Sequence, residues 1–170
     1  MKNTGKVFEK EFRDSIPEDV YYKKMQDSAN GFNVEDSKLR FAAKSPYDFF
    51  LYWKPNMWCL ELKSISGTSI SFEGKKPLIK KHQREELLKA YKYGCIAGFV
   101  MNFRKFPFTY FVPITLFEQF VKNSKKKSIN LKDIQDMEDG ENGTLLIDQE
   151  LMRTHYRYAV GRFLDVTGKH

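Results

Sequence analysis

The residues best suited to chemistry are two carboxylates and a lysine in the first half of the chain. Glu61 and Lys63 lie two positions apart in an apolar run, and Asp48 lies 13 residues before Glu61. Two carboxylates in a partly buried site repel each other unless a cation neutralises them, and a hard ion such as Mg²⁺ prefers oxygen ligands. Such an ion binds phosphodiester oxygens and lowers the pKa of a bound water. The lysine ammonium would orient that water or stabilise charge that develops on phosphorus.

A predicted β-hairpin brings these three residues together. The apolar runs 47–54 and 57–65 are separated by a Pro-Asn pair, which is the clearest hairpin signal in the sequence. Folding at this turn places Asp48 alongside Glu61 and Lys63, which share one face of their strand because side chains alternate. The opposite face is expected to point into the core and comprises Trp58, Leu60 and Leu62.

The same constellation has a plainer explanation, a salt bridge between neighbouring strands on a half-exposed sheet. The Glu61-Leu62-Lys63 motif alone favours that explanation, because the pattern is common. An aspartate at hairpin distance, apolar flanks and a basic stretch that follows together favour the metal site. Cys59 shares the face of Glu61 but has no histidine at a suggestive spacing, so a thiol nucleophile is not expected.

The rest of the chain supplies a mixture of helices and strands to position this site. Helices are predicted for residues 4–15, 76–93, 114–122 and 149–165, and strands for 20–25, 47–54, 57–65, 95–103 and 108–112. An acidic loop is predicted for 133–142, and the last helix is expected to turn Leu151, Tyr158 and Phe163 inward. This order predicts an α/β fold, a mixed central β-sheet flanked by helices, in a single domain of residues 1–170.

The composition is that of a basic globular protein. The chain has 170 residues, of which 41% are apolar or aromatic, and this is enough for one hydrophobic core. The net charge is +7, and residues 61–127 hold 14 basic residues against 5 acidic ones. Such a local excess indicates a polyanionic partner, most often nucleic acid, although a ribosomal or anionic-membrane contact would also fit.

Several protein classes are excluded at the level of sequence. No apolar run is long enough to cross a membrane, and the charged residues 1–10 do not form a signal peptide. Cys59 and Cys95 belong to no CxxC pair and the three histidines lack metal-ligand spacing, so neither a zinc site nor a disulfide framework is expected. We expect a cytoplasmic protein without a membrane partner, and any bound metal would need oxygen ligands.

Basic side chains crowd the segment that follows the Glu-Leu-Lys motif. On the predicted helix, Lys76, Lys80 and Arg84 share one face. Contact with DNA phosphates is one interpretation, because backbone contacts dominate DNA affinity, and a solvated helix face is the other. The same two interpretations apply to residues 122–127.

Aromatic residues follow the next predicted strand and its turn. They suggest a platform on which bases stack, but a sheet core or a dimer seam is the favoured interpretation. The residues concerned are Phe103, Phe106, Phe108, Tyr110 and Phe111.

Several motifs resemble a known nuclease superfamily. Ser45-Pro46-Tyr47-Asp48, followed by Glu61-Leu62-Lys63, resembles the PD-(D/E)xK signature, and the closest likeness is to the RecU family of Holliday junction resolvases. The Asp48 to Glu61 separation is that of the family. Residues 3–9 resemble the family's N-terminal Asn-x-x-Gly-x-x-x-Glu pattern, shortened by one residue at its start. The likeness covers residues 3–9 and about 46–103, including Lys80-Lys81-His82-Gln83 and the strand at 94–100.

The resemblance implies a restriction-endonuclease-like fold and a role for individual residues. Asp48 and Glu61 would bind Mg²⁺, for which Mn²⁺ would substitute, and Gln83 would complete the metal site. Lys63 would stabilise the transition state. Glu9 would be an outer ligand or would position water, and the alternative for Glu9 is an ion pair with Lys6 or Arg13 on an exposed helix.

Two features depart from the family pattern. A threonine expected near the aspartate is absent, and Ser45 and Pro46 occupy that region. The family also inserts a basic stalk before the aspartate strand, thought to enter the centre of the four-way junction. Residues 26–45 form a shorter insert, and its few basic residues include Lys38 and Arg40. Junction specificity is therefore less strongly implied than metal-dependent cleavage.

The leading hypothesis is a Mg²⁺-dependent, structure-selective DNA endonuclease that resolves four-way junctions in recombination and repair. Two symmetric nicks across a two-fold axis require a homodimer. One alternative is a nuclease that cuts branched or duplex DNA without junction preference, and another is a non-catalytic nucleic-acid-binding accessory protein of recombination. The expected DNA contacts are Lys38, Arg40, Lys75, Lys76, Lys80, Lys81 and Arg84.

Overall fold

The computed structural model describes residues 4–25, 45–138 and 143–169. The helices are α1 (Thr4–Arg13), α2 (Lys81–Lys92), α3 (Ile114–Asn123), α4 (Leu131–Gln135) and α5 (Val160–Thr167). The strands are β1 (Tyr21–Lys24), β2 (Phe49–Trp53), β3 (Asn56–Ile65), β4 (Ser69–Ser71), β5 (Ile96–Phe103), β6 (Phe108–Pro113), β7 (Ser128–Asn130), β8 (Leu145–Leu146), β9 (Gln149–Leu151) and β10 (Tyr156–Tyr158).

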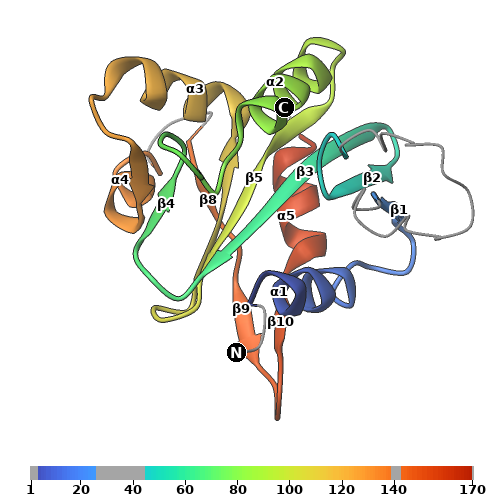
Figure 1. The fold of residues 1–170 in the computed structure, drawn as a ribbon. Helices are drawn as coiled ribbons and strands as arrows, with labels where there is room; N and C mark the ends of the chain where they lie inside the picture. The colour runs from blue at the N-terminus through green and yellow to red at the C-terminus, as the bar shows by residue number, and fades with distance from the viewer. Residues whose placement is uncertain (1–3, 26–44, 139–142, 170) are drawn as a thin grey trace, which may run out of the picture.

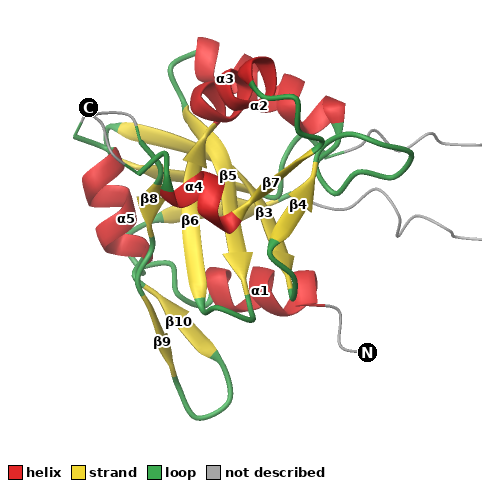
Figure 2. Ribbon diagram, turned by 90° about the vertical axis from the view of Figure 1, so that its left-hand side faces the viewer, coloured by secondary structure: helices red, strands yellow, loops and turns green. Residues whose placement is uncertain are grey.

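A six-stranded sheet in the order β1-β2-β3-β5-β6-β8 forms the centre of the molecule (Figure 1). Strands β3 and β5 are parallel and are connected through α2, whereas the other neighbours are antiparallel. Two small sheets, β4–β7 and β9–β10, accompany it, and the β9–β10 hairpin projects beyond the body of the protein (Figure 2). The mixed sheet flanked by helices confirms the predicted fold class.

Apolar side chains cover both faces of the central sheet. Helices α1 and α5 bring Phe8, Phe12 and Phe163 into the cluster on one face, where each is at most 2% exposed. Helices α2 and α3 bring Leu87 and Phe117 into the cluster on the other face. Each helix thus buries one apolar stripe. Because both faces are covered, a charged side chain in a central strand is removed from solvent.

The central hairpin has the faces that the sequence predicts. Trp58, Leu60 and Leu62 of β3 join the cluster beneath α1, while Cys59 belongs to the opposite cluster. Strands β5 and β6 and helix α3 also lie where they are predicted, with bounds that differ by one residue. The signals were strong because long apolar runs were bounded by turn residues.

The helix predicted for 76–93 starts only with α2, and the segment before it is a loop. Ile79 N–H donates to the carbonyl of Ser71 (2.9 Å), so the chain folds back before the helix begins. A proline follows Lys76 and disfavours helical backbone at that residue. The prediction that Lys76, Lys80 and Arg84 share a helix face is therefore wrong.

The helix predicted for 149–165 is wrong over its first half, where β9 and β10 form instead. Tyr156 N–H donates to the Glu11 carboxylate (3.1 Å), a contact with α1 that a helix would replace by an internal bond. This tertiary contact favours the strand. Leu151, predicted to point inward, is 66% exposed, whereas Tyr158 is buried.

Two other predicted segments lie partly or mostly outside the described residues. The acidic loop predicted for 133–142 begins inside α4, whose N-cap Asn130 accepts from Asp133 N–H (2.9 Å). Apart from its last residue, the stalk-like insert 26–45 lies outside the described residues, and so do Lys38 and Arg40. Within the residues that the structure describes, no helix is both long and apolar enough to span a membrane.

Candidate active site

Asp48 lies directly before strand β2 and close to Glu61 of β3. The β2–β3 register ends with Phe49 opposite Leu60, and Asp48 is the next residue outward. Asp48 N–H donates to the Leu60 carbonyl (3.1 Å), which holds its backbone beside β3. Its carboxylate reaches the N–H of Leu62, and the charge of Glu61 acts on it. The structure therefore brings together the two carboxylates that the hairpin pattern singled out.

Burial and nearby charges set the protonation of Asp48. Asp48 Oδ2 accepts a hydrogen bond from Leu62 N–H (2.8 Å). Desolvation and the charges of Glu61 and Glu9 together raise the pKa of Asp48 to about 7, although the Leu62 N–H and Lys63 oppose the rise. The acidic cluster thus carries more negative charge than its lysine neutralises, and an added cation would relieve that repulsion.

Lys63 is held against Glu61 on the same strand. Its Nζ lies 2.6 Å from Glu61 Oε1, and the two side chains are only 15% and 3% exposed. A buried ion pair of this kind is costly to form unless further groups satisfy the remaining atoms. Side chains two residues apart on a strand point to the same face, so the ammonium of Lys63 lies in the acidic cluster beside Glu61.

Gln83 approaches the cluster from the first turn of α2. Its Nε2 donates to Glu61 Oε1 (2.5 Å), and its Oε1 accepts from the backbone N–H of Lys80 (3.0 Å) as part of a capping box. An amide oxygen has two lone pairs, so the second remains available for a cation. The helix start thus fixes Gln83 beside Glu61, where the family resemblance predicts it.

Glu9 is the fifth candidate residue of this site and comes from α1. Its carboxylate forms an ion pair with Lys24 of β1, and its charge contributes to the raised pKa of Asp48. Arg13, one of the two partners considered from the sequence, pairs instead with Asp14 (2.8 Å). The Lys24 partner was missed because β1 is a separate element that meets α1 only through the fold.

The donor types around this cluster suit a hard divalent cation. Asp48 and Glu61 supply carboxylate oxygens and Gln83 supplies an amide oxygen, which are ligands that Mg²⁺ accepts together with water. Among the described residues, no three His, Cys, Asp or Glu side chains lie close enough to hold a metal by themselves. An ion here would therefore rely on two carboxylates, an amide and solvent, a set that fits Mg²⁺ and not zinc.

Four predicted DNA-contact residues lie together at the entrance to α2. Lys75, Lys76, Lys80 and Lys81 are all exposed. Lys80 is the N-cap of the helix that carries Gln83, so this surface adjoins the acidic cluster. The loop with the first two lysines is anchored by Phe72 and Ile79, which are buried.

Arg84 is placed differently from these lysines. Its Nε and Nη2 donate to the two carboxylate oxygens of Glu118 on α3 (2.6 and 2.8 Å), and the guanidinium lies 5.8 Å from the centre of the Phe117 ring. The side chain is 18% exposed, and Glu118 raises its pKa. Arg84 therefore links α2 to α3.

Cys59 and three of the five aromatic candidates are part of the core. Burial raises the pKa of Cys59 to about 12, which opposes formation of a thiolate nucleophile. Phe103, Tyr110 and Phe111 are at most 3% exposed, so the core interpretation applies to them, while Phe108 is 37% exposed.

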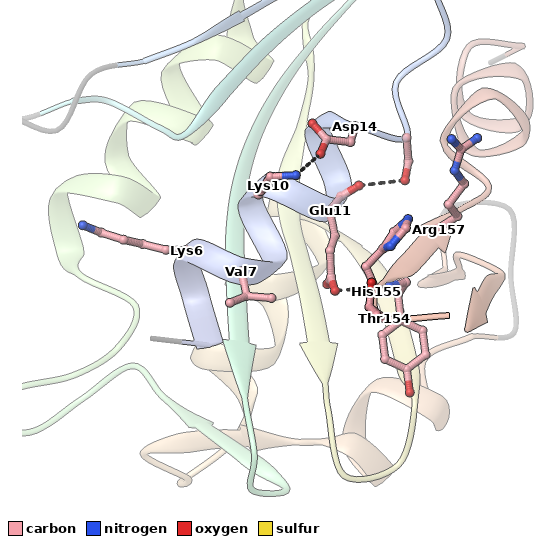
Figure 3. A pocket seen from close by; sticks show the side chains of 10 residues that line it. Lys6, Val7, Lys10, Glu11, Asp14, Thr154, His155 and Arg157 are labelled. Atoms are coloured by element: carbon pink, nitrogen blue, oxygen red, sulfur yellow. Dashed lines mark hydrogen bonds and ion pairs between the residues drawn. The ribbon is translucent and has the colours of Figure 1, made fainter. Parts of the chain in front are cut away.

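A second charged cluster, missed by the sequence reasoning, is centred on Glu11 of α1. Its carboxylate accepts from Arg104 Nη2 (2.6 Å) and from Tyr156 N–H (3.1 Å), and the Tyr158 hydroxyl donates to it (3.4 Å). A cavity of about 490 Å³ lies beside it between α1 and β10, lined by Lys10 among others (Figure 3). None of the acidic-site residues lines this cavity, so the Glu11 cluster joins α1 to β10 and leaves the chemistry to the β2–β3 hairpin.

Comparisons with known proteins point to one family. The family model of RecU, recombination protein U, matches residues 7–148. The SPbeta prophage-derived uncharacterized protein YotM of Bacillus subtilis (strain 168) is 32% identical over 139 residues, which cover 75% of this chain and 68% of that protein. The solved structure of Hjc from Archaeoglobus fulgidus, a Holliday junction resolvase, aligns with a TM-score of 0.43 and 13% identity over 68% of this chain and 78% of that chain.

Proposed function

The chain belongs to the RecU (recombination protein U) family, and from this premise we propose that it is a Mg²⁺-dependent endonuclease that resolves four-way DNA junctions. The observation that carries the proposal is the closeness of the Asp48 and Glu61 carboxylates, with Lys63 and Gln83 both bonded to Glu61. A purely structural salt bridge needs one carboxylate and one cation. The second carboxylate gives the site the negative charge that recruits a metal ion.

Each residue of the site has a distinct task in the proposed reaction. Asp48, Glu61 and the amide oxygen of Gln83 would hold Mg²⁺, and Mn²⁺ would substitute. When bound, the ion supplies a Lewis acid for the scissile phosphate and an activated water. Lys63, held 2.6 Å from Glu61, would donate from its ammonium to a phosphate oxygen as negative charge increases there. Glu9 is an outer group that orients water at the Asp48 side.

The lysines at the entrance to α2 would hold the substrate. Lys75, Lys76, Lys80 and Lys81 are exposed next to the helix that carries Gln83. Contacts between such side chains and phosphates supply most of the sequence-independent affinity for DNA. We also propose Lys38 and Arg40, which lie outside the described residues, as contacts of the insert. Arg84 is bound to Glu118 and is less suited to the role.

Junction resolution sets requirements beyond one active site. A single domain carries one acidic cluster, and symmetric resolution needs two nicks related by a two-fold axis. A homodimer acting on branched DNA in the cytoplasm is therefore part of the proposal.

The direct test incubates a labelled four-way junction with the protein and Mg²⁺. We expect paired nicks at symmetric positions, and faster cutting of the junction than of a linear duplex of the same length. Equal rates on both substrates would favour a branched- or duplex-DNA nuclease without junction preference. Intact junctions at stoichiometric protein, without calorimetric binding of Mg²⁺ or Mn²⁺, would favour the non-catalytic module and contradict the proposal.

A further inference from the structure

A second group of lysines, distant in sequence, lies against the proposed DNA-holding loop. Strands β4 and β7 pair with Ser71 opposite Ser128, so the residues beyond them continue side by side. The carbonyl of Lys127 accepts from the N–H groups of both Phe72 and Glu73 (3.0 and 3.2 Å). The lysine run 125–127 is therefore fixed next to the loop that carries the first basic group.

The loop itself has a defined shape. Its two ends meet at Ser71, whose carbonyl accepts from Ile79 N–H (2.9 Å) and whose Oγ accepts from Leu78 N–H (3.1 Å). Phe72 and Ile79 are 4% and 0% exposed and anchor the loop in the core. Gly74, at φ +118°, permits the turn near the tip. Lys75 and Lys76 are thus presented on a fixed support.

The two lysine groups leave several cations without a carboxylate partner. Lys126 contacts Asp133 (2.5 Å) and Lys81 contacts Glu85 (3.5 Å). Among the described residues, none forms an ion pair with Lys125 or Lys127, which are both exposed. The same holds within that part of the chain for three lysines of the first group, Lys75, Lys76 and Lys80. Glu73 is the acidic residue of the loop segment 72–80.

We infer that Lys125 and Lys127 extend the lysine loop into one continuous phosphate-binding surface, which holds a duplex arm of the DNA substrate on the β4–β7 side of the active site. This inference rests on the proposed function and names the part of the chain that takes up the arm. These five lysines have few acidic neighbours and lie on two segments that are hydrogen-bonded to each other. Such an arrangement suits the regularly spaced phosphates of a DNA backbone. Lys126 stays with Asp133 and holds the segment in place.

The test compares binding of a four-way junction by the wild-type protein and by the double variant Lys125→Ala/Lys127→Ala, in EDTA to prevent cutting. We expect junction affinity to fall on the order of tenfold, and the salt dependence of log K to lose about two contacts' worth of slope. The double variant Lys125→Arg/Lys127→Arg retains the charge and should bind like the wild type. Equal unfolding midpoints would show that the alanine variant is folded.

A control removes two exposed lysines from another part of the surface, of which Lys169 pairs with Asp165 (2.8 Å). Lys54 lies in the β2–β3 turn and Lys169 follows α5, near the contact of Asn56 with Gly168 (2.8 Å). Lys54→Ala/Lys169→Ala should leave the affinity and the slope close to the wild-type values. An alanine variant at 125 and 127 that binds as tightly as the wild type, with an unchanged slope, would overturn the inference. Failure of the wild-type protein itself to bind or cut junctions would instead contradict the proposed function.

Discussion

Two buried glutamates, Glu11 and Glu61, show how similar surroundings serve different purposes. They are 6% and 2% exposed, and each contacts one basic side chain at 2.6 Å. Glu11 faces Arg104 and is completed by backbone and hydroxyl donors of β10, so its charge is matched. Glu61 faces Lys63 and also the carboxylate of Asp48. A buried carboxylate whose charge is neutralised by its neighbours holds secondary-structure elements together. Two buried carboxylates that share one lysine carry excess negative charge, and a cation can neutralise it.

The largest effect is expected at the Asp48–Glu61 pair. Glu61→Gln removes a proposed metal ligand while keeping the shape of the side chain, so junction cleavage should fall by on the order of 10³-fold. Junction binding in EDTA should remain, because the lysine surface is untouched. Single-turnover cleavage and a gel-shift titration measure the two. A cleavage rate near that of the wild type would remove Glu61 from the active site.

Loss of the Glu11–Arg104 pair should lower stability and affect cleavage much less. Glu11→Gln leaves Arg104 and the donors of β10 without their charged acceptor, so the free energy of unfolding should drop by about 2–3 kcal/mol. This lies below the usual loss for a fully buried pair because Arg104 is 18% exposed. Denaturant unfolding measures the drop. Cleavage per folded molecule should change far less than in Glu61→Gln, and the reverse ranking would undo the comparison.

The pH dependence of stability should also differ between variants of the Asp48–Glu61 site and variants of the Glu11 cluster. Because the pKa of Asp48 is raised to about 7 from 3.8, the folded state holds a proton that the unfolded chain has lost over that interval. Stability of the metal-free protein should therefore decrease as pH rises from about 4 to 7. Asp48→Asn should remove that part of the slope, and Glu11→Gln should retain it. Mg²⁺ affinity, measured by calorimetry, should increase over the same interval as the proton leaves.

The smallest effect is expected at Arg84, a cation that already has a carboxylate. Arg84→Gln should lower the free energy of unfolding by on the order of 1 kcal/mol, since its pair with Glu118 is only partly buried. Junction affinity should stay near the wild-type value, in contrast to Lys75→Ala/Lys76→Ala, which should weaken it. An Arg84 variant that loses affinity as strongly as the lysine variant would return Arg84 to the DNA-binding surface.

Most of the site could be predicted because its residues lie close together in the sequence. Asp48, Glu61 and Lys63 belong to one hairpin, whose register depends on a short turn and on the alternation of apolar residues. Gln83 was found only through the family resemblance, because an amide in a polar helix start has no pattern of its own. Lys24 and Arg104 were not found at all, since no turn or strand register in the sequence ties either of them to its glutamate.

The errors in the predicted fold also arose from contacts between separate segments. Strand β10 was predicted as helix, and its backbone is held by Glu11 of α1, a partner that lies 145 residues away. The start of α2 was placed too early because Ile79 is tied to Ser71 by a hydrogen bond that no local propensity encodes. Local propensity is a weak preference that such tertiary contacts override.

By itself the sequence determined the mixed α/β class, the central hairpin with its two carboxylates and lysine, and the excess of basic residues in 61–127. Those features depend on periodicity, turns and composition, which are local or additive. Only the tertiary structure decided which charges are matched: Arg104 with Glu11, Glu118 with Arg84, and the lysine run at 125–127 beside the loop at 75 and 76. Charge matching depends on distances between segments, and folding alone sets those distances.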